Sequence, residues 1–179
     1  ITITLALLLF IMIQAAILGD NRTTTAPVPA TAKPDQQPAP TVYSMNQDVP
    51  SGDVVWKVTK VRDRGNALRA SESRYPSIAK IKTTSGKFIE VYITLENRGT
   101  DLASITTPNL IDSQNREYTD ISFQVMEWLP EDKGIYLLQN LNPNLPKDFV
   151  VMFEVPADAS GLVLKVGVFH PQLIRLDLQ

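Results

Sequence analysis

The chain opens with a long apolar run. Between Ile1 and Leu18 the polar residues are Thr2, Thr4 and Gln14, and no residue is charged. A helix needs about 20 apolar residues to span the hydrocarbon layer of a bilayer, whereas an amphipathic core helix would show a polar face every 3.6 residues. The run therefore predicts an uncleaved transmembrane helix over residues 1–19. The residues expected to anchor it in the membrane are Leu5, Leu8, Phe10, Ile13 and Ala16.

A cleaved secretory signal is the alternative interpretation of this run. Cleavage requires small residues at both specificity positions before the cut, and the segment from Gln14 to Asp20 fits this requirement poorly. A bacterial lipoprotein would need a Cys near Gly19, and the chain has no Cys. We therefore expect a single-pass membrane protein whose C-terminal domain is extracytoplasmic, in the periplasm or at the cell surface.

Residues 20–42 are expected to form a Pro/Thr-rich extended linker. Five Pro residues lie between positions 27 and 40, and the segment contains no aromatic residue. Such a segment buries too little apolar surface to offset the entropy of folding. It favours polyproline II and would act as a semi-rigid stalk up to roughly 60 Å long. Asn21 begins an N-glycosylation sequon, but such short sequons often occur by chance, and a plain polar spacer is the default interpretation of the segment.

Beyond the linker, residues 43–179 show the period-two pattern of β-strands. Residues 86–99 alternate most regularly, which is typical of a half-buried strand. Shorter alternating runs follow at residues 52–61, 148–156 and 161–169, with turn signals between them. Seven or more short strands without a long helix predict an antiparallel β-sandwich. Its expected core residues are Trp56, Phe88, Val91, Ile93 and Phe153.

Composition restricts the chemistry that this domain could perform. The net charge is −2 and the sequence shows no basic stripe, which argues against a nucleic-acid partner. With no Cys and one His, most zinc, haem, iron–sulfur and Cys-nucleophile chemistry is excluded. His170, between a predicted strand and a Pro, has no Ser, Asp or second His at local spacing.

Acidic residues cluster twice but do not form a calcium-binding pattern. The clusters lack the alternating Asp spacing and the turn Gly that a calcium loop uses. They comprise Glu127, Glu131 and Asp132, and then Asp112, Glu117 and Asp120. Phosphate-loop, nucleophile-elbow and zinc-protease motifs do not occur in the sequence. We expect a non-enzyme with no catalytic residue, no cofactor and no metal.

The segment from Ser122 to Gly134 mixes apolar and acidic residues. Apolar side chains on a long loop either fold back onto the sandwich or meet a partner, and Trp and Met are enriched at interface cores. The candidate interface residues are Phe123, Met126, Trp128 and Leu129. A basic cluster at Arg62, Arg64 and Arg69 is either a solvated loop or a contact for an acidic partner or lipid head groups.

Five blocks of the sequence resemble a bacterial family of unknown function. The blocks cover residues 52–58, 86–99, 110–118, 141–144 and 150–156, and they extend over about residues 50–178. Members of that family are secreted lipoproteins or membrane-anchored proteins with a telokin-like, immunoglobulin-type β-sandwich, related to a mycobacterial immunoprotective extracellular protein. The resemblance implies an all-β, immunoglobulin-like fold and an extracytoplasmic location, and no catalytic residues. This chain departs from the pattern by lacking the lipid-modified Cys and by longer segments at Arg62–Ser85 and Phe123–Gly134.

Together these features predict a non-enzymatic, membrane-anchored binding or scaffolding protein. Its most concrete form is an accessory structural subunit of a larger membrane complex, with other membrane-protein subunits and the bilayer as partners. Two alternatives stay open: a pilin-like filament subunit with the apolar helix in the filament core, and a free-standing ligand-binding or adhesion module. A filament would self-associate through the first 20 residues, whereas an accessory subunit would co-purify with unrelated chains at a fixed ratio.

Overall fold

The computed structural model describes residues 41–133 and 140–178. The predicted anchor residues Leu5, Leu8, Phe10, Ile13 and Ala16, and most of the linker, lie outside these ranges. Within the described ranges, no helix has the length and apolar character needed to cross a bilayer.

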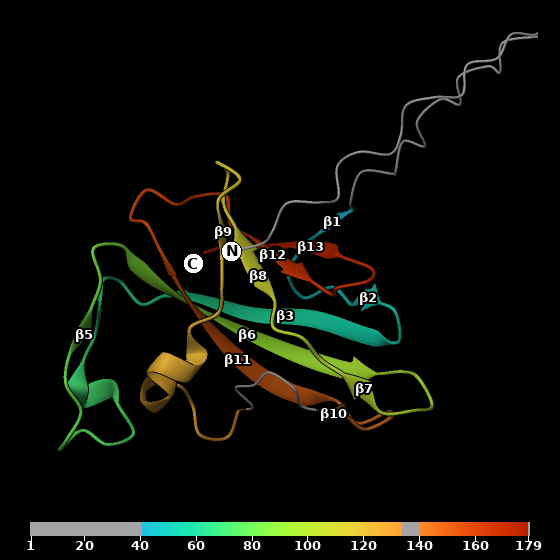
Figure 1. The fold of residues 1–179 in the computed structure, drawn as a ribbon, viewed down its shortest axis with the longest axis horizontal. Helices are drawn as coiled ribbons and strands as arrows, with labels where there is room; N and C mark the ends of the chain where they lie inside the picture. The colour runs from blue at the N-terminus through green and yellow to red at the C-terminus, as the bar shows by residue number, and fades with distance from the viewer. Residues whose placement is uncertain (1–40, 134–139, 179) are drawn as a thin grey trace, which may run out of the picture. The chain divides into compact units, whose positions relative to one another are not determined.

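Two β-sheets pack face to face, which confirms the predicted β-sandwich (Figure 1). The four-stranded sheet is antiparallel throughout. Its strands, in spatial order, are β11 (Lys147–Val155), β6 (Lys87–Asn97), β3 (Val54–Asp63) and β2 (Val49–Ser51).

The five-stranded sheet is antiparallel except for its first pair, β1 with β13. Its order is β1 (Val42–Tyr43), β13 (Gln172–Arg175), β12 (Val163–Val166), β8 (Asn109–Ile111) and β9 (Glu117–Tyr118). Two short antiparallel pairs complete the strands: β7 (Ala103–Ser104) with β10 (Asn140–Leu141), and β4 (Ala67–Leu68) with β5 (Lys82–Thr83).

The core between the two sheets is built from alternate positions of the strands. Trp56, Val91, Ile93 and Phe153 all lie in it and are buried. In β3 the alternation is interrupted by a bulge between Val58 and Lys60, so both Val58 and Val61 reach the core. The bulge explains why the apolar spacing of this strand is only approximately two.

A second apolar cluster covers the opposite face of the four-stranded sheet. It contains Phe88 from β6 and Val150 and Met152 from β11, together with Leu68, Val125, Trp128 and Leu129. The expectation of a half-buried β6 was therefore wrong for its first half, where Phe88, Ile89, Glu90 and Val91 are all buried. The alternation predicted for residues 148–156 was likewise wrong, because Phe149 to Phe153 of β11 are all buried by the same double coverage.

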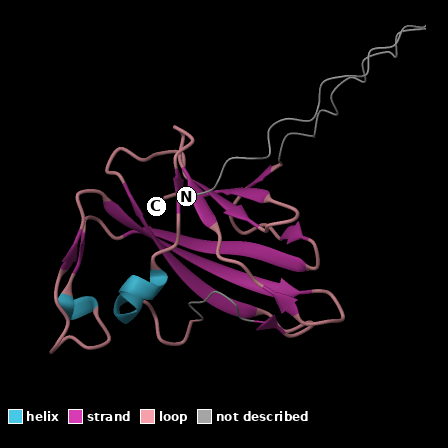
Figure 2. Cartoon of the chain, viewed as in Figure 1, coloured by secondary structure: helices cyan, strands magenta, loops and turns pink. Residues whose placement is uncertain are grey.

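Residues 64–85 and 121–133 supply this cover, and we call them together the outer layer. They contain β4, β5 and two short 3₁₀ helices, η1 (Ala70–Glu72) and η2 (Ser122–Trp128). Figure 2 shows both helices on the same side of the domain as the β4–β5 pair. The two segments correspond closely to Arg62–Ser85 and Phe123–Gly134, the two regions in which this chain is longer than the family pattern. The two longer regions therefore form one structural unit.

Two sequence blocks meet at Asn97, which is fully buried. Its Nδ2 donates hydrogen bonds to the carbonyl oxygens of Leu141 and Asp101 at 2.9 and 2.7 Å, and its Oδ1 accepts one from the Gly99 N–H at 2.9 Å. The backbone N–H of Asn144 donates to the Asn97 carbonyl at 2.7 Å. One amide side chain thus joins the turn after β6 to the turn after β10.

Candidate partner interface

Arg74 joins the two segments of the outer layer. Its backbone N–H donates to the Glu127 carbonyl at 2.7 Å, and its Nε and Nη2 donate to the carbonyls of Leu129 and Met126 at 2.9 and 2.6 Å. These carbonyls lie at the C-terminal end of η2, where the Met126 carbonyl also accepts the Leu129 N–H at 3.2 Å. The turn around Arg74 is therefore fixed against η2 although the two are about 50 residues apart in sequence.

Trp128 makes a second link between the same segments. Its side chain packs in the second apolar cluster, and its Nε1 donates to the Arg69 carbonyl at 2.9 Å. Trp128 and Leu129 were two of the four candidate interface residues, but they are 7% and 1% exposed. A buried indole needs both apolar contact and a partner for its N–H, and the outer layer provides both.

An ion network around one buried carboxylate links β3 and β6 to the outer layer. The Glu90 carboxylate, 1% exposed, accepts a hydrogen bond from Arg64 Nη1 at 3.2 Å, and Arg62 Nη1 lies 3.5 Å from the same oxygen. Burial raises the pKa of the neighbouring Tyr92 hydroxyl, and a hydrogen bond to Tyr92 raises the pKa of Arg62. These groups line a cavity of about 380 Å³ together with Trp128. Two of the three residues of the predicted basic cluster are thus paired with Glu90.

The start of η2 is attached to the outer edge of β11. The Met152 N–H donates to Ser122 Oγ at 2.8 Å, and the Ile121 N–H donates to the Met152 carbonyl at 2.7 Å. Asp120 accepts hydrogen bonds from the Ser122 backbone and hydroxyl. Burial raises the pKa of Asp120, although these hydrogen bonds oppose the rise. The edge of the sheet and the helix are therefore held together at a defined position.

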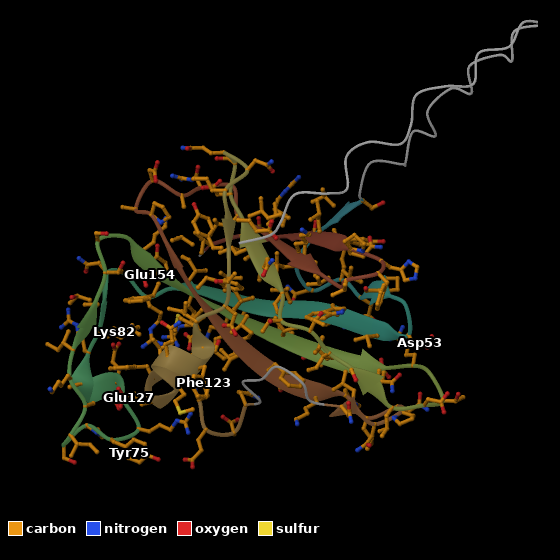
Figure 3. All side chains as sticks on the ribbon, in the orientation of Figure 1. Asp53, Tyr75, Lys82, Phe123, Glu127 and Glu154 are labelled. Carbon is orange, nitrogen blue, oxygen red and sulfur yellow. The ribbon has the colours of Figure 1, made fainter. Side chains whose placement is uncertain are left out.

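On this framework the outer layer exposes large apolar side chains, four of which lie on η2 and on the turn beside it. Phe123 and Met126 of η2 are 69% and 41% exposed, and Tyr75 and Ile78 of the neighbouring turn are 54% and 77% exposed. Figure 3 shows Phe123, Glu127 and Tyr75 in the same region of the domain, as the Arg74–Glu127 hydrogen bond requires. We call Tyr75, Ile78, Phe123 and Met126 the outer-layer patch. Of the four candidate interface residues, it retains Phe123 and Met126.

The acidic clusters do not converge in the structure. Among the described residues, no group of three or more His, Asp or Glu side chains is arranged to hold a metal ion. Asp112 instead organises the β8–β9 turn, where its carboxylate accepts hydrogen bonds from Gln114, Arg116 and Tyr118. Burial raises its pKa, but these hydrogen bonds outweigh burial and lower the pKa to about 2.

The far end of the sandwich brings together polar residues that the sequence spacing did not associate. Ser51, Asp53 and His170 line a cavity of about 390 Å³ with Trp56 and Phe169. The residue types are those of a hydrolase triad, but Ser51 Oγ donates to the His170 backbone carbonyl at 2.9 Å. Asp53 lies against Gly99. Ser51 and His170 are 119 positions apart in sequence, so no local spacing associates them.

The architecture is that of a bacterial β-sandwich protein, as solved structures show. A Bacillus subtilis protein, yjhA, shares 18% identity at a TM-score of 0.52, covering 75% of this chain and 99% of its own. A conserved hypothetical protein of Bacillus anthracis shares 13% identity at a TM-score of 0.54. The match covers 73% of this chain and 94% of the Bacillus anthracis chain. The secreted protein MPT63 of Mycobacterium tuberculosis shares 12% identity at a TM-score of 0.50. The match covers 79% of this chain and 99% of MPT63. Identities this low establish the fold alone.

The chain belongs to the family described as domain of unknown function DUF4352, whose model matches residues 43–172. No curated protein gives a significant match. The matched range begins at Tyr43. It also includes both segments of the outer layer.

Proposed function

We propose that this chain is a non-catalytic binding subunit, with residues 1–19 in the bilayer and an immunoglobulin-like sandwich outside the cytoplasm. Its partner is another membrane-protein subunit, which it contacts through the outer-layer patch. The observation that carries the proposal is the exposure of Tyr75, Ile78, Phe123 and Met126 on a framework fixed by Arg74.

Preorganisation distinguishes this patch from scattered surface apolar residues. Single exposed apolar side chains are common and need no explanation, but these four come from two segments joined by hydrogen bonds and a shared apolar cluster. A fixed surface loses little conformational entropy on binding. Aromatic residues and Met are enriched in the centres of protein interfaces, which is the composition of this patch.

Two further observations support the non-catalytic role and the location. In the cavity at the far end, the Ser51 hydroxyl is used in a structural hydrogen bond to a backbone carbonyl. MPT63, one of the structural relatives, is described as a secreted protein. The apolar run from Ile1 to Leu18 would hold this chain at the membrane surface instead of releasing it.

Co-purification from gently solubilised membranes tests the proposal. The full chain should resist alkaline extraction and should bring down another polypeptide at a fixed ratio. The double variant Phe123→Asp with Met126→Asp should lose that polypeptide, because burying two carboxylates in an apolar contact is unfavourable. The matched control, Leu102→Asp with Leu145→Asp, adds the same charges to exposed apolar residues elsewhere and should retain it.

Three outcomes would contradict the proposal. One is extraction of the chain into the aqueous fraction, and another is equal recovery of the partner with both double variants. The third is a homopolymer held together by residues 1–20, which would favour the filament. Equal thermal melting of the variants and the wild type verifies that lost binding does not reflect lost folding.

A further inference from the structure

The preceding chain joins the domain beside the β12–β13 turn. Strand β1 pairs in parallel with β13, with Val42 opposite Leu173. Thr41 is therefore next to Gln172 across the pair, within a few residues of Phe169. Whatever holds residues 1–40 thus acts on the domain at this end.

Four turns converge at the same end, which we call the turn end. The Arg98 N–H donates to the Asp53 carbonyl, and the Asn144 N–H donates to the Asn97 carbonyl, so the turns after β2, β6 and β10 are neighbours. The β12–β13 turn joins them through the Ser51–His170 hydrogen bond. Strand β3 separates the turn end from the outer layer by ten residues, or about 33 Å. In Figure 3, Asp53 and Tyr75 lie at opposite ends of the domain.

The turn end presents exposed apolar side chains on three of its turns. Phe169 and Val168 in the β12–β13 turn are 91% and 62% exposed, and Leu102 and Leu145 are 61% and 60% exposed. Val168 and Phe169 border the cavity of about 390 Å³, whereas Leu102 and Leu145 do not line it, so the four side chains do not form one groove. A surface of separate apolar tips suits a deformable apolar medium better than a shaped protein partner.

The β12–β13 turn is built to hold its tip in one position. Gly167 has a φ of +76°, and a Cβ at this position would overlap Ser51 Oγ, so a larger residue would displace the turn. Ser51 Oγ then holds the His170 carbonyl on the other side of the tip. Val168 and Phe169 are the residues between these two fixed points.

The tip is also free of formal charge. No Asp, Glu, Lys or Arg occurs between Lys165 and Arg175. The neighbouring turns carry Asp53 and Asp101, while Arg98 is paired with Asp48 and Glu96. This charge pattern offers no attraction to an anionic surface and fits a zwitterionic one.

We propose that the β12–β13 tip, Val168 and Phe169, inserts into the interface of a zwitterionic bilayer and orients the domain on the membrane. The inference rests on the proposed anchor at residues 1–19, because the anchor brings the domain to the bilayer. The linker expected over residues 20–42 is long enough to permit such an approach. Insertion at the turn end leaves the outer-layer patch accessible to a partner, because Tyr75 lies at the opposite end of the domain from Asp53 (Figure 3).

Single-site fluorescence on the full chain tests this inference. The chain has no Cys, so Phe169→Cys and the control Ile78→Cys, each labelled with NBD, report from one position each. Ile78 is a matched control because it is an exposed apolar residue of the outer-layer patch. The proteins are reconstituted into phosphatidylcholine vesicles, with and without doxyl-labelled lipid, and floated on a density gradient.

The inference predicts flotation with the vesicles, a blue-shifted emission at position 169, and a roughly twofold or greater quenching there by shallow doxyl groups. Position 78 should keep an aqueous spectrum and show little quenching. Adding Val168→Asp should reverse the shift at position 169 without preventing flotation.

The failures of the two proposals are distinguishable. A chain that does not float overturns the anchor and this inference together. A chain that floats with an aqueous spectrum at position 169 overturns the inference and leaves the anchor intact. A blue shift without lipid quenching indicates contact with a second copy of the chain, and equal quenching at position 78 indicates unspecific adsorption, so both results contradict oriented insertion.

Discussion

Replacing Trp128 tests whether the outer layer is part of the folded domain. The side chain is 7% exposed, packs with Leu68, Phe88 and Met152 in the second cluster, and donates to the Arg69 carbonyl. Trp128→Ala removes a nearly fully buried indole, for which about 3–5 kcal/mol of unfolding free energy is expected. Trp128→Phe keeps most of the packing and loses the hydrogen bond, which costs about 1 kcal/mol.

Urea unfolding followed by the fluorescence of Trp56 measures these changes. Trp56 lies in the core between the two sheets, so in either variant the remaining indole reports on the sandwich and not on the mutated layer. With an m-value of about 2 kcal/mol/M, Trp128→Ala should lower the midpoint by about 2 M and Trp128→Phe by about 0.5 M.

A urea midpoint for Trp128→Ala within about 0.25 M of the wild type would contradict the packing of Trp128 into the folded domain, because substitutions at exposed positions cause changes of that size. It would show that the outer layer unfolds separately from the sandwich. The partner surface would then be formed on binding and would not be preorganised.

Substitutions at two further residues, Asn97 and Asp112, test the turns. Asn97→Asp replaces a donor with an acceptor facing two carbonyl oxygens, and should destabilise the domain more than Asn97→Ala, itself expected to cost about 1–3 kcal/mol by thermal or urea unfolding. Equal losses would show that the donated bonds are unimportant. For Asp112 the folded pKa of about 2 lies below the unfolded value of about 3.9, so its contribution is present above pH 4 and is lost as the pH falls toward 2. Urea midpoints between pH 5 and 2 should therefore fall more steeply for the wild type than for Asp112→Asn, and parallel curves would exclude the assigned role.

The sandwich could be predicted because its signals are local. The alternation around β6 and the Val and Trp residues of β3 directly reflect which side chains face the core, and the bulge near Val58 shifts the pattern by only one position. The face of the four-stranded sheet that the outer layer covers left a weaker signal in the sequence. That signal is the apolar run in β11 and the position of Phe88 on the same face of β6 as Glu90.

The outer layer could not be assembled from the sequence because its contacts are non-local. Arg74 and η2 carry no complementary pattern that identifies them as partners, and their hydrogen bonds go to backbone carbonyls, which every residue possesses. For the same reason the sequence could not separate Phe123 and Met126, which are exposed, from Trp128 and Leu129, which are buried. The kink at Val125 within η2 breaks the helical spacing that would otherwise sort them.

The cavity at the turn end could not be predicted from the sequence either. Ser51, Asp53 and His170 have no local spacing, and they meet because the β2–β3 and β12–β13 turns emerge at one end of two different sheets. The blocks that carried the family resemblance are explained more directly: Asn97 and Asp112 sit within them and each fixes a turn. Residues that fix turns identify the fold of a family, but they carry no information about its binding partner.

Photo-crosslinking in intact membranes tests the central claim, an anchored domain that binds a protein partner through its outer layer. The full chain would carry benzoylphenylalanine at position 123, or at exposed position 114 in the β8–β9 turn as the control. We expect position 123 to give a membrane-bound adduct with a different polypeptide, and position 114 to give no adduct. Equal adducts from the two positions, or no adduct from position 123 in a chain that stays in the membrane, would contradict it.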